Sequence, residues 1–390
     1  LSRNRMRKNR LCARRQGEPL ARYRYMLPAR KRFPYNSASM APTVRTKARP
    51  TIHEFELIHA LHRRHSRRTP SVIRGIGDDA AVIASQAGQW TVLTTDLLTE
   101  GIHFDLRTAT MADIGFRAAA ANLSDIAAMG ATPQYLLVSL AIPRRDVAAQ
   151  VHQLYRGMMA ACRPHHVSLI GGDTSASDGG WFLSLTLTGT VPPRKALFRS
   201  GARVGDGLYV TGTIGDSLAG LRILNEPPRR ASRRPRAASF STKHRKFLIG
   251  RHLRPTARIE EGQWLSAHRF ATSAIDISDG LSGDLRHICE ESHVGVELDL
   301  GALPLSPACR AYAAARKLDP VELALTGGED YELLFTASPR QRLRLEQSAG
   351  ERGFSLTCIG KIHPHRFGIQ TLSPQGRHHR LANRSYEHFR

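Results

Sequence analysis

The sequence predicts a mixed α/β protein with two folded domains. From residue 51 onward, segments with the alternating pattern of strands interleave with segments of helical periodicity. They do so without a strict strand–helix–strand rhythm and without a short internal repeat. The chain has 390 residues, enough for two domains of ordinary size. Two adjacent prolines, Pro192 and Pro193, mark the expected boundary between domains at 51–192 and 193–390.

The first half alternates between helical and strand patterns. Thr110 and Asp113 have the spacing of a capping box at the start of an alanine-rich helix, in which Asp125 is one of few acidic residues. The segment 146–162 places Val147, Val151, Leu154, Met158 and Cys162 on one stripe, as in an amphipathic helix. The expected helices are 51–65, 110–130 and 146–162, and the expected strands are 75–83, 90–100, 135–142, 167–173 and 181–191.

The second half continues in the same manner. Its glycines stand mostly between predicted elements, where they indicate turns. The expected helices are 216–224, 259–268 and 280–292, and the expected strands are 207–212, 273–278, 294–300 and 330–337.

The net charge of +24 is concentrated in two segments. Residues 1–50 contain 15 Lys and Arg but a single acid, Glu18, and residues 225–246 contain eight against Glu226. We expect the first to be a disordered extension and the second, at about 226–246, to be a surface-loop insertion. The extension fits three interpretations: a nucleic-acid-binding arm, a targeting peptide, or a non-functional extension ahead of a start at Met26 or Met40.

Several classes of protein are disfavoured by the sequence. No apolar run reaches about 18 residues, so we expect no membrane span. The five cysteines are scattered without a CxxC pair, which favours reduced thiols and a cytoplasmic location over a zinc site or disulfides. The chain lacks the P-loop motif and the protein-kinase motifs, and the glycine-rich stretch 211–220 lacks dinucleotide-binding spacing.

Acidic residues are few, 33 in 390, but many follow a predicted strand and have glycine or a small hydroxyl residue beside them. Each alone is explained as a turn or cap residue. Together they form the oxygen-rich ligand set that Mg²⁺ requires, and such a set becomes favourable around divalent ions that carry a polyphosphate. The residues are Asp78, Asp79, Asp96, Asp125, Asp173, Asp276, Asp279, Glu329 and Asp330.

Short motifs that contain these residues follow one another in a fixed order. They read GIGDDAAVI, TTDLLTEGIHF, NLSDIAAMGATP, LIGGDT, RSGARVGDGLYVTGTIGDSLAGL, HLRPTARIEEG, AIDISDGLSGDL and LTGGEDYELLFT. In this order they strongly resemble the thiamine-monophosphate kinase family, of the superfamily that includes aminoimidazole ribonucleotide synthetase and selenophosphate synthetase. The resemblance runs from about residue 52 to SYEHF near the C-terminus, and the two basic segments have no counterpart in it.

The resemblance implies a two-domain aminoimidazole ribonucleotide synthetase-like fold. An N-terminal sheet domain would form a homodimer, and ATP and several Mg²⁺ ions would lie in the cleft between it and a C-terminal α/β domain. The implied reaction transfers the γ-phosphoryl group of ATP to thiamine monophosphate, giving thiamine diphosphate and ADP, the last step of thiamine diphosphate biosynthesis.

The resemblance also implies roles for individual residues, carried over by motif. The implied metal ligands are Asp79, Thr94, Thr95, Asp96, Asp125, Asp173, Asp276 and Asp279. The implied ATP contacts are Gly172, Asp173, Arg199 and Ser278. The implied contacts to thiamine monophosphate are His103, Glu329 and Tyr386. The role of Asp78, next to Asp79, is left open.

The chemistry of the implied reaction agrees with these residue types. Phosphoryl transfer needs in-line positioning and charge neutralisation, and the substrate's own phosphate oxygen is the nucleophile. We therefore expect no protein general base, no protein nucleophile and no phosphoenzyme. Arg199 can fork onto a phosphate, Tyr386 can stack on a heteroaromatic ring, and Glu329 offers a negative charge to a thiazolium or an acceptor to an aminopyrimidine.

Two alternatives stay open from the sequence. One is another ATP-dependent enzyme of the superfamily, although the reactive Cys/Sec-Gly loop expected of a selenophosphate synthetase does not appear before GIGDDAA. The other is a nucleic-acid-binding protein that acts through its basic segments. It predicts salt-sensitive binding that is lost when residues 1–50 and 226–246 are deleted. Neither a membrane nor nucleic acid is the favoured partner.

Overall fold

The computed structural model describes residues 70–85, 88–144, 147–227, 240–382, 384 and 386. The basic extension at 1–50 and the helix expected at 51–65 lie outside the described residues. So do residues 228–239 of the basic insertion. None of the described helices is long and apolar enough to cross a membrane.

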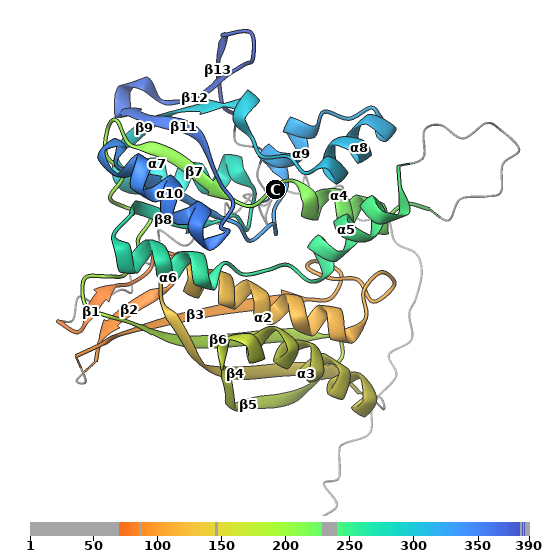
Figure 1. Cartoon of the computed structure of the whole chain (residues 1–390). Helices are drawn as coiled ribbons and strands as arrows, with labels where there is room; N and C mark the ends of the chain where they lie inside the picture. The colour runs from red at the N-terminus through yellow and green to blue at the C-terminus, as the bar shows by residue number, and fades with distance from the viewer. Residues whose placement is uncertain are drawn as a thin grey trace, which may run out of the picture. The chain divides into compact units, whose positions relative to one another are not determined.

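The described residues form two β-sheets and nine α-helices, shown in Figure 1. The strands are β1 Val72–Arg74, β2 Ala81–Ala84, β3 Trp90–Thr99, β4 Thr132–Pro143, β5 Ser168–Ser177, β6 Phe182–Val191, β7 Gly207–Thr211, β8 Ala271–Asp276, β9 Val294–Asp299, β10 Leu333–Ala337, β11 Leu356–Pro364, β12 Ile369–Leu372 and β13 His378–Arg380. The helices are α2 Met111–Ala128, α3 Ala148–Cys162, α4 Asp216–Leu224, α5 Thr242–Leu253, α6 Ile259–His268, α7 Leu281–Ser292, α8 Pro307–Arg316, α9 Pro320–Thr326 and α10 Arg342–Arg352.

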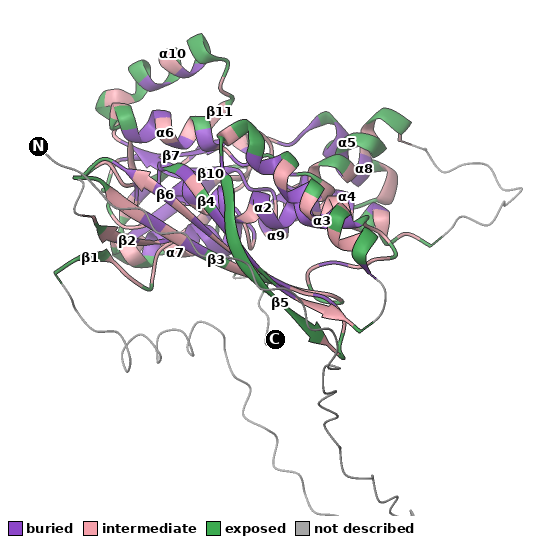
Figure 2. Cartoon of the chain, turned by 90° about the horizontal axis from the view of Figure 1, so that it is seen from below, coloured by how far each residue is buried: buried purple, intermediate pink, exposed green. Residues whose placement is uncertain are grey.

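The N-terminal sheet has six strands in the order β1-β2-β3-β6-β4-β5. Alternate residues of β6 are buried, as expected when one face of a strand packs on helices. β5 is different, because nearly all of its residues are exposed and it pairs with β4 alone (Figure 2). β5 therefore ends the sheet with an open edge.

The C-terminal sheet has seven strands in the order β13-β12-β9-β11-β7-β10-β8. β8 is its edge strand and ends at Asp276, directly before the turn that leads into α7. β10 is buried along its whole length, since it lies between β7 and β8. This topology brings the end of β8 next to the loop that precedes β10.

Helix α2 joins the two halves of the fold, and its partners are visible in Figure 1. The capping box expected at Thr110 and Asp113 starts it. Small residues such as Ala118, Ala119, Ala127 and Ala128 stand among its buried positions, so neighbouring elements can approach closely. A Cβ at Gly262 of α6 would collide with the carbonyl of Ala127, so the α2–α6 contact requires a glycine there. The carboxylate of Asp125 is thus carried by a helix that is packed on several sides.

The predicted elements are confirmed in most places, and some boundaries are corrected. The strand expected at 75–83 begins only at Ala81, because Gly77 with φ +116° turns the chain before it. The strand expected at 330–337 begins at Leu333, because Tyr331 has a positive φ of 52°. The insertion expected at about 226–246 is shorter, since α5 starts at Thr242 with Ser241 as its N-cap.

Candidate functional site

Three carboxylates from distant parts of the sequence meet at the centre of the structure. They belong to Asp79 in the turn before β2, Asp125 on α2 and Asp276 at the end of β8. One carboxylate oxygen of each lies within 4.8 Å of the others. We call these residues the acidic cluster. All three were predicted as metal ligands from the sequence.

Hydroxyl groups orient two members of the acidic cluster. Thr94 of β3 donates its hydroxyl hydrogen bond to Oδ2 of Asp125. Ser124 donates to Oδ2 of Asp276 at 2.6 Å, so α2 orients Asp276 through Ser124 and carries Asp125 at the next position. Because Ser124 is completely buried, this bond also links the N-terminal and C-terminal halves of the fold inside the protein.

Among the residues that the structure describes, one arginine pairs with a carboxylate of the cluster. Arg199 donates from Nε and Nη2 to Oδ1 of Asp79, at 2.9 and 2.5 Å. Its backbone N–H donates to Asp78, which also accepts from Nε of Arg74 at 2.8 Å. Asp78 therefore holds the turn and the Arg199 backbone, while Asp79 faces the cluster. A single cation accompanies several acidic groups.

Asp96 extends the acidic surface along β3. It lies two residues after Thr94 and so on the same face of the strand. Its Oδ2 is buried and makes no hydrogen bond in the structure, as is also true of Oδ2 of Asp79. Buried carboxylate oxygens without a partner are costly, because they lose their contacts with water.

Burial and mutual repulsion raise the pKa values of these carboxyl groups. Burial, then the nearby Asp79, raises the pKa of Asp276 to about 8. Burial and Asp279 raise the pKa of Asp96 to about 6. The pKa of Asp125 lies well above its ordinary value because of burial and then of Asp96 and Asp276. Each shift has the direction expected when acids are gathered without enough positive charge.

These features fit a divalent cation. The donors are carboxylate and hydroxyl oxygens, the ligands that Mg²⁺ prefers. Two buried oxygens, on Asp79 and Asp96, have no partner within the described part of the chain. A bound cation would supply that partner and would offset the repulsion that raises the pKa values.

The loop before β10 lies against the turn after β8. Glu329 donates its N–H to the carbonyl of Ser278 at 2.8 Å, and Tyr331 donates to the carbonyl of Ile277 at 2.9 Å. Tyr386 donates its N–H to the carbonyl of Asp279 at 3.2 Å. These bonds bring Ser278, predicted to contact ATP, and Asp279, predicted as a metal ligand, together with the predicted substrate residues Glu329 and Tyr386.

His103 is also fixed near this loop. Its Nδ1 accepts from the N–H of Thr99 at 3.0 Å, so its ring proton lies on Nε2 when the ring is neutral. Its carbonyl accepts from Arg117, which in turn pairs with Glu329 at 3.3 Å. The two predicted substrate residues His103 and Glu329 therefore share one arginine.

Three predicted residues lie apart from the acidic cluster of their own chain. Thr95 is on the opposite face of β3 from Thr94, and its hydroxyl donates to the carbonyl of Leu185 at 3.0 Å. Gly172 and Asp173 are on β5, three strands away from β3 in the sheet order. At about 4.8 Å per strand the separation is about 14 Å.

The structure adds residues that sequence reasoning missed. Asp284, in the first turn of α7, is 2% exposed and accepts from the N–H of Gly280, and its pKa is raised well above the ordinary value by burial and then by Asp279 and Asp276. Arg117 and His252 are both buried and contact each other at 2.9 Å. The spacing of Asp284 after the Ser278–Gly280 turn was the available signal for that residue. Arg117 and His252 carried none, because they are 135 residues apart.

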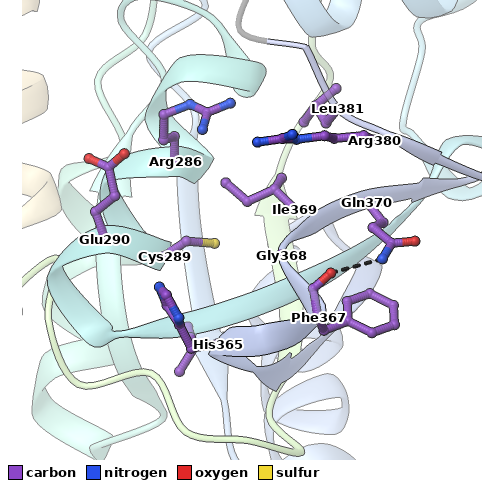
Figure 3. A pocket seen from close by; sticks show the side chains of 11 residues that line it. Arg286, Cys289, Glu290, His365, Phe367, Gly368, Ile369, Gln370, Arg380 and Leu381 are labelled. Atoms are coloured by element: carbon purple, nitrogen blue, oxygen red, sulfur yellow. Dashed lines mark hydrogen bonds between the residues drawn. The ribbon is translucent and has the colours of Figure 1, made fainter.

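A cavity of about 530 Å³ lies in the C-terminal half, between α7 and the β12–β13 hairpin (Figure 3). Arg286 and Cys289 of α7 line one side of it and Ile369 and Arg380 the other. None of the residues predicted from the sequence as metal, nucleotide or substrate contacts lines this cavity.

The fold and the site have clear relatives. The family model for the AIR synthase related protein N-terminal domain matches residues 77–191, and that for its C-terminal domain matches residues 203–370. A solved hydrogenase maturation protein HypE from E. coli, 18% identical with a TM-score of 0.59 over 84% of this chain and 97% of its own, shares the fold.

Nearer relatives are thiamine-monophosphate kinases. That of Escherichia coli (strain K12) is 39% identical over 86% of this chain and 98% of its own length, and that of Bacillus subtilis (strain 168) is 35% identical over 86% and 99%. The solved structure of AaThiL complexed with AMPPCP and TMP superposes with a TM-score of 0.72, at 32% identity over 86% of this chain and 97% of that one. The chain therefore belongs to the thiamine-monophosphate kinase family.

Proposed function

We propose that this chain is an ATP-dependent kinase that phosphorylates thiamine monophosphate to thiamine diphosphate. Its relatives carry that activity in their names, and one of them was solved with AMPPCP and TMP. The observation on this chain that carries the proposal is the acidic cluster. Its Asp79 has a buried oxygen without a partner, and a bound cation would supply that partner. The alternative of a nucleic-acid-binding protein is not favoured by these relatives.

We propose Mg²⁺ as the cation of the acidic cluster. Asp79, Asp125 and Asp276 would hold it, with Asp96 and Asp279 beside them and Thr94 orienting Asp125. When bound, Mg²⁺ screens the repulsion between the phosphate groups and stabilises the charge that develops during transfer. Ser124 holds Asp276 by a hydrogen bond and is the sequence neighbour of Asp125. The two carboxylates are therefore in place before ligands bind, so they need to move little when the cation enters.

Arg199 is proposed to contact ATP. Its guanidinium lies at the cluster already, paired with Asp79, and is 20% exposed in its side chain. Once cations neutralise Asp79, the guanidinium fork can turn to a phosphate, a geometry for which it is suited. Ser278, in the turn after β8, is the second proposed nucleotide contact from this half of the fold.

The thiamine end of the substrate is assigned to His103, Glu329 and Tyr386. Glu329 is 29% exposed in its side chain, so one part of its carboxylate remains open to a ligand. Its negative charge suits a thiazolium cation. The aromatic ring of Tyr386, in a residue 51% exposed, offers a stacking surface.

We propose a homodimer that forms through the N-terminal sheet. One face of that sheet exposes Leu97 of β3, Tyr135 and Leu137 of β4, and Leu169 and Ile170 of β5 are exposed beside them. Adjacent exposed apolar residues of this kind mark interaction surfaces. A second copy placed there would bring its own β5, with Gly172 and Asp173, toward this chain's β3, which explains why these residues lie far from the cluster within one chain.

A cytoplasmic location is proposed as well. Cys162, Cys289 and Cys309 are buried and unpaired, and Cys358 is unpaired. Burial raises the pKa values of the thiols of Cys162, Cys289 and Cys309, which keeps them unreactive. Free, unreactive thiols are typical of a reducing compartment.

The assay that tests the proposed function is direct. Purified protein with ATP, Mg²⁺ and thiamine monophosphate should form equal amounts of ADP and thiamine diphosphate, resolved by chromatography. Asp125→Asn should lower kcat at least about 100-fold, as when an electrostatic group of a transition state is removed. If thiamine monophosphate does not stimulate ADP formation by the wild-type protein, the proposal is wrong.

A further inference from the structure

Arg117 is a buried arginine in a helix whose other buried residues are uncharged. It lies on α2 and is 4% exposed. Burying a guanidinium costs several kcal/mol unless its donors are satisfied by well-placed partners. Arg117 precedes Asp125 by eight residues, which is about 12 Å along a helix axis. It thus sits on the same packed helix as the acidic cluster, toward the end where the substrate residues gather.

The donors of Arg117 reach three groups that are far apart in the sequence. Nη1 lies 2.9 Å from Nε2 of His252 on α5. Nη2 donates to the carbonyl of His103 and lies 3.3 Å from Oε1 of Glu329. One side chain therefore connects the loop after β3, helix α5 and the loop before β10.

The contact with Arg117 determines the protonation of His252. Arginine carries only donors, so Nε2 of His252 must accept, and the ring proton must lie on Nδ1. Nδ1 is 3.0 Å from the hydroxyl of Ser217 and 3.5 Å from Oε2 of Glu329. Burial and then the charge of Arg117 lower the pKa of His252 to about 3, in agreement with a neutral ring.

Glu329 is held from two sides by this arrangement. Its carboxylate faces the guanidinium of Arg117 with one oxygen and the Nδ1 side of His252 with the other. Its backbone has a positive φ of 61°, fixed by the hydrogen bond of its N–H to Ser278. Burial raises the pKa of Glu329 above its ordinary value, and the charge of Arg117 opposes part of that rise by favouring the carboxylate.

We propose that Arg117 is a positioning residue for the cationic heteroaromatic part of the substrate. It keeps Glu329 ionised and aimed at the ligand, and it holds the loop of His103 through its carbonyl. Neutral His252 accepts a hydrogen bond from Nη1 of Arg117 and so fixes the orientation of the guanidinium. This inference rests on the proposed function, in which Glu329 and His103 contact thiamine monophosphate, and assigns to that site two residues that contact no ligand themselves.

The proposal predicts a selective effect on one of the two substrates. In Arg117→Met the KM for thiamine monophosphate should rise about 10- to 100-fold, the range for loss of a charged hydrogen bond. The KM for ATP should stay within about twofold of wild type, because the acidic cluster keeps its ligands. Arg117→Lys, which retains the charge but not the two-armed geometry, should recover part of the loss.

A matched control removes a different arginine that also contacts α2. Arg254 pairs with Asp113 at 2.7 Å and is 54% exposed in its side chain. Arg254→Met should leave both KM values within about twofold of wild type. In a double-mutant cycle, Arg117→Met should add less than about twofold to the KM of Glu329→Gln, because the two residues act through one interaction.

Three results would overturn the inference. They are an unchanged KM for thiamine monophosphate in both Arg117 variants, an equal rise of both KM values, or fully multiplicative effects in the cycle. If Arg117→Met does not fold, Arg117→Lys and its cycle with Glu329→Gln decide the question. Absence of any thiamine monophosphate phosphorylation by wild-type protein would instead refute the proposed function, so the two failures are distinguishable.

Discussion

Two groups of buried acids in this molecule differ in what neutralises them. Glu332, which is 0% exposed, accepts from both arms of Arg258 at 2.6 Å and from Arg251 at 2.7 Å. The hydroxyl of Thr211 donates to the same carboxylate. Within the described part of the chain, the acidic cluster of Asp79, Asp125 and Asp276 pairs with one arginine, Arg199, and an oxygen of Asp79 remains buried without a partner.

This difference indicates that Glu332 has a structural role and that the acidic cluster has a functional one. Around Glu332 the chain supplies two arginines, which also pair with Glu261 at 3.2 Å and Asp216 at 3.9 Å, so each of these acids has an arginine partner. Around the acidic cluster it supplies one cation for several carboxylates, and the pKa values of Asp276 and Asp125 rise in response. The charges around Glu332 therefore stabilise the interior without a ligand, whereas the acidic cluster has unneutralised carboxylates that an external cation can bind.

The largest expected effect on stability is at the complete group. Glu332→Gln takes their shared carboxylate from Arg258 and Arg251 and leaves them Glu261 at 3.2 Å and Asp216 at 3.9 Å, so the free energy of unfolding should fall by about 3 kcal/mol. Urea unfolding of metal-free protein measures it. A loss below about 1 kcal/mol would show that the carboxylate is not essential to this group.

The same kind of substitution in the acidic cluster should have the opposite profile. Asp276→Asn removes a repelling charge, so the unfolding free energy of metal-free protein should stay the same or rise by about 1 kcal/mol. Turnover should fall about 100- to 1,000-fold, because a group that holds the cation is lost. Urea unfolding and steady-state kinetics on one preparation measure both quantities. If Asp276→Asn strongly lowered stability and left turnover normal, the acidic cluster would be structural, contrary to the account.

The pH dependence of stability should reveal the incomplete group. The folded-state pKa values of Asp276, Asp78 and Asp96 are raised to about 8, 7 and 6. The folded protein therefore binds more protons than the unfolded chain, and its stability is full near pH 4 and falls as pH rises toward 8. The expected slope in metal-free protein is on the order of 1 kcal/mol per pH unit. Saturating Mg²⁺ with AMPPCP should flatten it, and a slope that is the same with and without them would contradict the account.

The smallest expected effect distinguishes two neighbouring threonines. Thr94 orients Asp125, so Thr94→Val should weaken Mg²⁺ binding about 3- to 10-fold, the value of one hydrogen bond. Thr95 faces the other side of β3 and bonds to Leu185, so Thr95→Val should leave the affinity of the isolated chain unchanged. Calorimetric titration with Mg²⁺ compares the two. An equal loss of Mg²⁺ affinity in the two variants would contradict the assignment of Thr94, and not Thr95, to the site.

Local signals in the sequence were sufficient for much of the fold. The capping box at Thr110 and Asp113 and the full extent of α6 appear as predicted, because caps and helical periodicity are properties of neighbouring residues. Helices α8, α9 and α10 were not predicted. The hydrophobic pattern of α10 is weak, with only Leu345 and Ala349 buried.

The site was predictable in composition but not in its pairings. Asp125 and Asp276 could be named from their motifs, whereas the hydrogen bond from Ser124 to Asp276 spans 152 residues and depends on how the two halves pack. The distance of Asp173 from the cluster follows from the strand order, in which β5 pairs with β4 rather than with β3. Neither fact is encoded in local sequence, since both arise from long-range contacts.

The central claim is that the acidic cluster binds the divalent cation that accompanies ATP. The most direct measurement is calorimetric titration of Mg²⁺ into the protein with AMPPCP at pH 7, in buffers of different ionisation enthalpy, for wild type and Asp276→Asn. The account predicts saturable binding that releases protons, since carboxyl groups with raised pKa values must lose them to bind metal, and affinity at least about 100-fold weaker in the variant. Binding of equal affinity in both proteins, or none in the wild type, would contradict it.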